Sequence, residues 1–294
     1  MSVLAQYSNV VLIGVAVTAG VVVPGMGPHL QPFVPLLVIF LVYSFLRGFR
    51  LQEVDVSADI GILLLSLGVS YLLLPLFGVH VARLFLSETS VLGFVIVFAA
   101  PTTAVSAIWT GFSNGDVRLA TTMTVGSMLA APIVTPLVLI WLIGSQATVP
   151  AAVVITELVV VIGGGIVVTV LVPQSILSER VINTGALAAL VIIIYASTAI
   201  VDIVQVDPTA LVAVVGVSTV LLGAGVAVSI WFERTLQFDR TQTLPLFFTS
   251  SMKNLGIALL ISNQIQPDPL MIATIVAYFI TQQLFAALVT DHVS

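Results

Sequence analysis

Ten long apolar segments separated by short polar stretches limit what this chain can fold into more than any other feature. Each is close to the roughly 20 apolar residues that a helix needs to cross the hydrocarbon of a bilayer. Charged residues make up only 7% of the 294 residues, whereas soluble domains carry about 25%. The sequence therefore predicts an all-α, multi-pass protein of the cell membrane. The expected spans cover residues 8–23, 32–46, 60–79, 89–112, 116–142, 149–172, 180–200, 209–232, 241–262 and 269–290.

The seven arginines predict the orientation of these spans. Six lie in or beside loops on one side of the expected bundle, and only Arg83 lies on the other. Because basic residues concentrate in cytoplasmic loops, this division predicts that both termini are cytoplasmic. The six are Arg47, Arg50, Arg118, Arg180, Arg234 and Arg240.

Several classes of function are disfavoured by what the sequence lacks. The chain has no cysteine, and its three histidines fall near expected helix ends, so we expect no resident metal or cofactor. An intramembrane enzyme would need a nucleophile with its base, or a metal with its ligands, within the spans. The net charge of −5 gives no reason to expect a nucleic acid as a partner. We therefore expect no enzymatic activity.

The order of the spans suggests two related halves, residues 1–147 and 148–294. If five helices are duplicated, the second copy inserts upside down, as in many secondary transporters. The fourth segment of each half combines a mid-span proline, Pro101 or Pro245, with a polar cluster at residues 102–106 or 249–254. Unwound backbone within hydrocarbon must be buried in protein or face water. We therefore expect helices 4 and 9 to be broken, with a binding site where the halves meet.

Lys253 is the most unusual residue of the chain. It is the only lysine, and it lies about twelve residues from either end of its span. An ammonium group at that depth costs about 2.5–3.5 kcal/mol, which makes it a candidate for a functional site. The alternative is a structural lysine paired with carbonyls or with a carboxylate, for which Glu157 on the sixth span is a candidate.

Other polar residues also lie deep in the expected spans. Gln282 and Gln283 cannot face lipid at low cost, so each makes either interhelical hydrogen bonds or substrate contacts, and the sequence favours neither. Thr121, Thr122 and Thr124 lie on the fifth span. We expect most of these hydroxyls to support helix packing.

Residues 101–106, 115–117, 129–136 and 252–259 resemble the bile acid/sodium symporter family, and the layout of the whole chain is similar to it. The resemblance implies a panel of helices 1, 2, 6 and 7 and a core of helices 3–5 and 8–10, in which the broken helices 4 and 9 cross. It also implies alternating-access transport of an organic anion, usually with two sodium ions. The substrate-binding candidates are Thr102, Thr103, Ala104, Val105, Asn254, Thr281 and Gln282.

The chain departs from the family where its members bind sodium. The ninth helix should carry a glutamate and, four residues on, a glutamine; here Thr249 and Lys253 stand there. The expected carboxylate is therefore absent, and a cation lies nearby. The other departures are Ala107 in place of asparagine after Ser106, Ser70 in place of glutamine on the third helix, and Ala120 in place of serine beside a retained Thr124 on the fifth.

These departures lead to a hypothesis about coupling. An ammonium about 4 Å from a sodium ion would repel it by about 4 kcal/mol at an effective dielectric constant of 20. We therefore predict that the Lys253 amine occupies the place of the bound ions and bonds to exposed carbonyls, Ser70, Thr249 or Ser106. Transport would then be independent of sodium, either proton-coupled or a passive uniport.

Other functions compete with this hypothesis. A conventional sodium-coupled symporter and an auxin-efflux-like carrier are the nearest alternatives, whereas arsenite carriers rely on a cysteine. A retinal-binding pigment is more distant, because it has seven spans with its lysine in the last. An ion channel would need a ring of charges or a carbonyl filter, for which the sequence has no motif.

Overall fold

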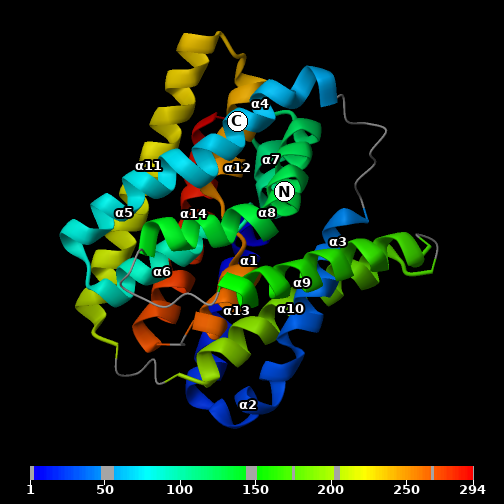
Figure 1. The fold of residues 1–294 in the computed structure, drawn as a ribbon, viewed down its shortest axis with the longest axis vertical. Helices are drawn as coiled ribbons and strands as arrows, with labels where there is room; N and C mark the ends of the chain where they lie inside the picture. The colour runs from blue at the N-terminus through cyan, green and yellow to red at the C-terminus, as the bar shows by residue number, and fades with distance from the viewer. Residues whose placement is uncertain are drawn as a thin grey trace.

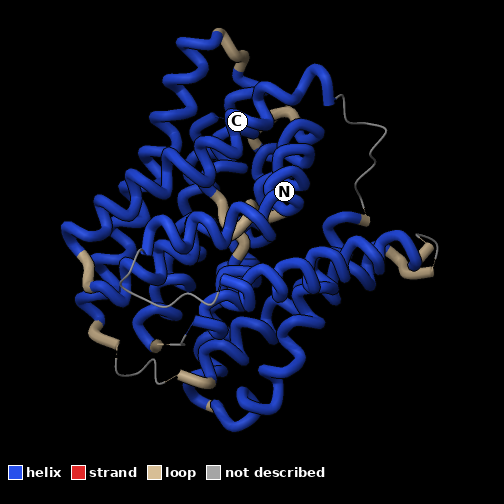
Figure 2. Tube along the Cα trace, in the orientation of Figure 1, coloured by secondary structure: helices blue, strands red, loops and turns tan. Residues whose placement is uncertain are grey.

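The computed structural model describes residues 3–47, 56–143, 151–173, 176–201, 206–265 and 268–293, and these are almost entirely helical (Figures 1 and 2). The expected boundary between the halves, at residues 147 and 148, and Arg50 lie outside the described residues. The longer helices are α1 (Val3–Val22), α3 (Val34–Leu46), α4 (Val56–Gly68), α5 (Leu74–Phe85), α6 (Glu88–Ala99), α7 (Val105–Phe112), α8 (Val117–Ile143), α9 (Ala151–Leu171), α10 (Glu179–Ala199), α11 (Pro208–Leu236), α12 (Arg240–Ser251), α13 (Leu255–Ile265) and α14 (Pro269–Val293).

Seven helical stretches among the described residues are long and apolar enough to cross a membrane. The protein is therefore an α-helical membrane protein, as predicted. The stretch Ile60–Phe85, which corresponds to the third expected span, extends beyond its expected end because the π-helical turn η4 (Val69–Leu73) joins α4 to α5 without a break. The others are Pro24–Leu46, Val117–Ile143, Ala152–Leu171, Glu179–Ala199, Pro208–Leu236 and Pro269–His292.

The connection between the first two expected spans is itself helical. Residues 24–33 form three short helical pieces: η1 (Pro24–Met26), α2 (Gly27–Leu30) and η2 (Gln31–Phe33). Each piece has a proline at its first or second position. Proline is tolerated there because those N–H groups have no partner within the helix. The repeated prolines therefore restart the helix rather than end it.

The predicted interruptions of the fourth and ninth spans are present. The helix stops between α6 and α7 and again between α12 and α13. Figure 2 shows non-helical stretches near the centre of the molecule. The capping box at Asp239 and Gln242 fixes the start of α12, and the Thr241 hydroxyl lowers the pKa of the Asp239 carboxyl below its ordinary value.

The helices pack as two groups, which Figure 1 shows at the lower right and the upper left. In the first group, α1 contacts α10, and α3 contacts both α9 and α10. In the second, α6 contacts α5, α8 and α14, while α11 contacts α5, α12 and α14. Helix α13 contacts α6 and α14 of the second group and also α3, α9 and α10 of the first. One helix of the interrupted pair α12–α13 therefore lies between the groups.

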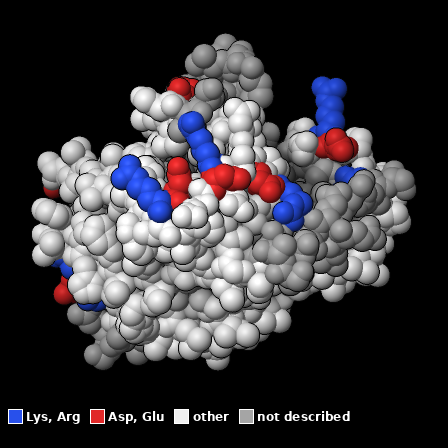
Figure 3. Space-filling view, turned by 90° about the horizontal axis from the view of Figure 1, so that it is seen from above, with Lys and Arg blue, Asp and Glu red and all other residues white. Residues whose placement is uncertain are grey.

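The surface has the polarity of a protein embedded in lipid. Large apolar side chains are strongly exposed, among them Val170 at 78%, Val212 at 73% and Ile133 at 70%. Figure 3 shows most of the charged side chains visible in that view gathered along one face. This separation fits a bilayer along the apolar flanks and water at the charged face.

Gly20 allows α1 to approach α10 closely. A Cβ atom at Gly20 would lie 2.1 Å from the Thr198 hydroxyl oxygen and 3.0 Å from the Tyr195 carbonyl oxygen, whereas one at Gly14 would meet open space. We expect Gly20→Ala to lower the midpoint of thermal unfolding in detergent, because overpacking costs about 1–3 kcal/mol. Gly14→Ala, on the same helix, is the matched control. Equal unfolding midpoints for the two variants would contradict this packing.

Candidate functional site

The two interruptions meet and pair their backbones. The Thr103 N–H donates to the Met252 carbonyl at 3.2 Å, and the Asn254 N–H donates to the Pro101 carbonyl at 2.9 Å. Thr102 and Lys253 form an isolated antiparallel bridge between them. Such pairing gives partners to backbone groups that the interrupted helices leave open, as burial within a membrane requires.

The two breaks have different local causes. Pro101 follows Ala100, which is extended with ψ 147°, because the residue before a proline is driven out of the helical conformation. The second break does not lie at its proline, since Pro245 is inside α12. There Met252 is extended, and the Asn254 side chain accepts the Ile257 N–H at 3.1 Å, which caps the new helix α13.

Lys253 lies at the centre of this meeting point, with only 2% of its surface exposed. Its ammonium donates to the Ser70 carbonyl at 2.9 Å, to the Ser70 hydroxyl at 2.7 Å and to the Phe98 carbonyl at 3.2 Å. These three bonds match the three hydrogens of an ammonium group. The Tyr71 ring adds a cation–π contact at 4.8 Å from the nitrogen to the ring centroid.

Both carbonyls are available because of local helix geometry. Ser70 belongs to the π-helical turn, where Leu74 N–H reaches back to Val69 and the regular α pattern is interrupted. Phe98 lies in the last turn of α6, where carbonyls lack partners within the helix and the helix dipole is negative. The lysine therefore binds two sites of negative potential built from backbone. Its three acceptors do not include Glu157, which lies half-buried on α9.

Gln282 holds the backbone of Lys253 from α14. Its side-chain oxygen accepts the Lys253 N–H at 2.9 Å, and its side-chain nitrogen donates to the Lys253 carbonyl at 3.1 Å. Gln283 accepts the indole N–H of Trp109 at 2.8 Å. The sequence left open whether these glutamines make interhelical hydrogen bonds or substrate contacts. In this structure both make interhelical hydrogen bonds.

The other expected ion-site residues lie nearby but do not touch the amine. Ser106 and Thr124 hydroxyls lie 3.0 Å apart, and the Thr249 hydroxyl lies 3.1 Å from that of Ser66. Of the predicted partners of Lys253, only Ser70 and exposed carbonyls contact it. Each of Thr121, Thr122 and Thr124 also donates to the carbonyl four residues earlier.

The predicted substrate residues surround the crossover without forming a large opening there. Ala104, Val105 and Asn254 are half-buried at the breaks, while Thr281 donates within α14 to Ala277. A cavity of about 10 Å³ is bordered by Lys253 and Asn254, which leaves space for about one water molecule at most. In this conformation the crossover is closed around the lysine.

Sequence reasoning missed several groups that complete the site. The Ser127 hydroxyl accepts the Thr102 N–H at 3.0 Å and lies 3.0 Å from the Tyr71 hydroxyl. The Tyr278 hydroxyl donates to the Ser251 carbonyl at 2.8 Å, beside the second break. Ser127 and Tyr278 carry no signal of their own in the sequence, because apolar helices contain many such residues.

Interrupted helices that meet deep within an α-helical membrane protein are typical of secondary transporters. A model of the Sodium Bile acid symporter family matches residues 35–208, more than half of the chain. The chain belongs to this family, so the resemblance found in its motifs is confirmed, and the protein is a transmembrane transporter. No individual curated protein sequence matches it.

We expect Gln282→Leu to destabilise the protein. The change leaves the Lys253 backbone N–H and carbonyl buried without these partners, and an unpaired buried group costs about 1–3 kcal/mol. The midpoint of thermal unfolding should fall clearly below that of Thr281→Ala, which removes a bond within a single helix. If the two variants unfold at the same temperature, Gln282 does not support the break.

Proposed function

We propose that this protein carries a small organic anion across the membrane by alternating access and without sodium. The observation that supports this proposal best is the position of Lys253. Its amine binds the exposed Ser70 and Phe98 carbonyls, which are the kind of hard oxygen ligands that alkali and alkaline-earth ions bind. The lysine ammonium would bind these carbonyls permanently, in the way that dissolved cations bind such oxygens reversibly in related carriers.

The proposed architecture has ten spans in two inverted repeats, residues 1–147 and 148–294. Beyond the seven long apolar stretches, α1 would supply one span, and the pairs α6–α7 and α12–α13 one each. The first group of helices would be the panel, formed by α1, α3, α9 and α10. The second group, together with α13, would be the core, and both termini would lie in the cytoplasm of the cell.

The electrostatics of the crossover argue against a bound sodium ion there. An ammonium about 4 Å away would oppose a second cation by about 4 kcal/mol at an effective dielectric constant of 20. The ninth span has Thr249 where the resemblance calls for a carboxylate, and that hydroxyl donates to the Pro245 carbonyl. Ser106 likewise donates to the Thr103 carbonyl at 2.8 Å. Both hydroxyls use their hydrogens within the fold but keep their oxygen lone pairs, so it is the missing carboxylate and the charge of Lys253 that disfavour sodium.

The same electrostatics favour an anionic substrate. The acceptors that the structure gives to Lys253 are carbonyls and a hydroxyl, none of which carries a full negative charge. A carboxylate arriving beside Asn254 would supply that charge. The N-terminal ends of α7 and α13 also lie at the breaks, and helix N-termini attract anions. Thr102, Thr103, Ala104, Val105 and Asn254 would line this side of the substrate path.

The first test is uptake by the purified protein in liposomes. A set of labelled bile acids, keto acids and pantoate is screened, with thermal stabilisation used to select those that bind. We expect uptake to be equal when external sodium is replaced by potassium, because no sodium binds.

Lys253→Ala should lose at least tenfold in uptake rate. Lys253→Met, of similar length, should lose as much, and its folding is checked by gel filtration. Sodium-stimulated uptake, or full activity of Lys253→Ala, would exclude the proposal.

The second test separates a uniport from proton coupling. Each ammonium hydrogen of Lys253 has an acceptor, so releasing a proton would leave a buried acceptor unpaired, and we expect the charge to be kept. A monovalent anion would then move one net charge per cycle, worth about 2.3 kcal/mol per 100 mV. A potassium diffusion potential, positive inside the liposomes, should therefore speed uptake. Uptake driven by a pH gradient and indifferent to voltage would show proton coupling instead.

A further inference from the structure

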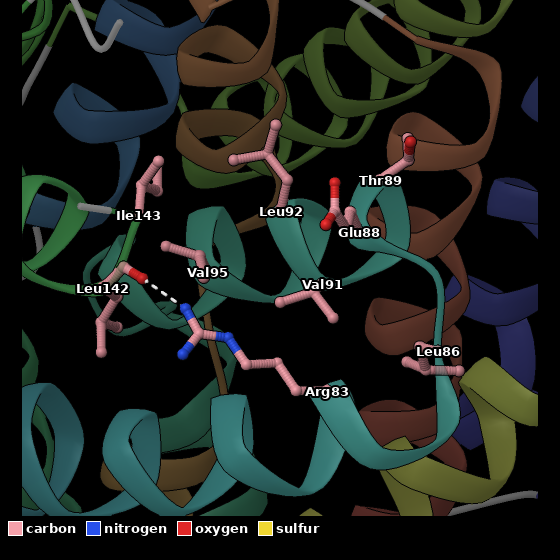
Figure 4. Close-up of a pocket in the computed structure, with 9 residues that line it drawn as sticks. All are labelled: Arg83, Leu86, Glu88, Thr89, Val91, Leu92, Val95, Leu142 and Ile143. Atoms are coloured by element: carbon pink, nitrogen blue, oxygen red, sulfur yellow. Dashed lines mark hydrogen bonds between the residues drawn. The ribbon is translucent and has the colours of Figure 1, made fainter. Parts of the chain in front are cut away.

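A second pocket lies away from the crossover, where α5 and α8 end and α6 begins (Figure 4). Its volume is about 370 Å³, which is in the range of small-molecule sites. Neither Lys253 nor any other residue expected at the transport site lines it. Three helix ends meet here, so the pocket opens near the surface of the membrane rather than at its centre.

Two side chains of opposite charge, Arg83 and Glu88, border this pocket without forming an ion pair with each other. The Arg83 guanidinium uses one N–H to donate to the Leu142 carbonyl at 3.0 Å, which leaves four of its five N–H donors. Glu88 lies in the first turn of α6. Among the described side chains, Arg83 and Glu88 form no ion pair with each other, so their charged groups lie more than 4 Å apart. Figure 4 shows Val91 on α6 between the two side chains.

The neighbouring surface is apolar and faces outward. Leu84 and Phe85 follow Arg83 in the last turn of α5 and are 76% and 69% exposed. In a membrane protein, large apolar side chains with such exposure contact acyl chains. Val91 and Val95, which line the pocket, are buried. The pocket therefore combines separated charges with an apolar wall and lies beside an exposed apolar surface where three helices end.

We propose that this pocket binds the headgroup of phosphatidylethanolamine. Arg83 would bind the phosphate, since a guanidinium fits phosphate oxygens in a bidentate manner. Glu88 would accept hydrogen bonds from the primary ammonium, and the acyl chains would run along Leu84 and Phe85. Phosphatidylcholine has no ammonium hydrogen to donate, and phosphatidylglycerol has no cation, so Glu88 selects against both. The headgroup would tie α5, α6 and α8 together as a lipid-dependent clamp on the core.

The test measures thermal unfolding of the full protein in detergent with each of the three lipids added. We expect phosphatidylethanolamine to raise the unfolding midpoint by several degrees more than either other lipid. Arg83→Gln should abolish that increase, and Glu88→Gln should make phosphatidylglycerol as effective as phosphatidylethanolamine. Arg234→Gln, in the last turn of α11, is the control and should keep the wild-type preference.

The Glu88→Gln result keeps the test decisive even if Arg83→Gln folds poorly, because it changes lipid preference rather than total binding. Equal stabilisation by all three lipids in the wild type would overturn the proposal, as would an unchanged preference in Glu88→Gln. Phosphoethanolamine without acyl chains serves as the soluble comparison. If it stabilises the protein as strongly as the lipid does, the pocket serves a soluble zwitterion and the lipid assignment is wrong.

Discussion

Two backbones that leave the helical conformation inside a membrane must find partners, and the rest of this structure depends on how that requirement is met. The breaks at residues 100–104 and 252–254 pair with each other, and side chains from α8 and α14 complete the pairing. Because water is excluded from this depth, each contact replaces a hydrogen bond that the bilayer cannot supply. The crossover is therefore held by many neutral hydrogen bonds around one charge.

In the proposed mechanism, Lys253 connects this structural requirement to transport. Its ammonium joins the π-helical turn after α4 to the end of α6, while its backbone is held by Gln282 on α14. In the proposed mechanism, the Lys253 ammonium takes the place of a dissolved cation between the Ser70 and Phe98 carbonyls. A charge that is covalently attached cannot be released at either side of the membrane. Within a family of sodium symporters, such a substitution would therefore uncouple transport from sodium without loosening the crossover.

Much of the site could be anticipated from residues whose burial carries a high cost. A lysine and two glutamines within apolar segments had to be paired. The structure pairs Lys253, Gln282 and the side-chain oxygen of Gln283, while the Gln283 side-chain nitrogen is buried without a hydrogen-bond partner. The sequence was less informative about the exact position of the second break and about which of several groups bind the Lys253 amine. The second break falls at Met252, within the polar cluster at residues 249–254 that indicated it, whereas Pro245 lies inside α12. Of the alternative partners expected for the amine, Ser70 and exposed carbonyls contact it, whereas Thr249 and Ser106 bond to other hydroxyls and to nearby carbonyls.

By itself the sequence determined the membrane environment, because the transfer cost of each residue depends on its type and not on its neighbours in space. It also indicated the two segments in which a helix breaks, since each combines a proline with a polar cluster. Only the tertiary structure decided that the Ser70 and Phe98 carbonyls bind Lys253, and that Arg83 and Glu88 border one pocket. A carbonyl belongs to every residue, so its availability is a property of local helix geometry and packing.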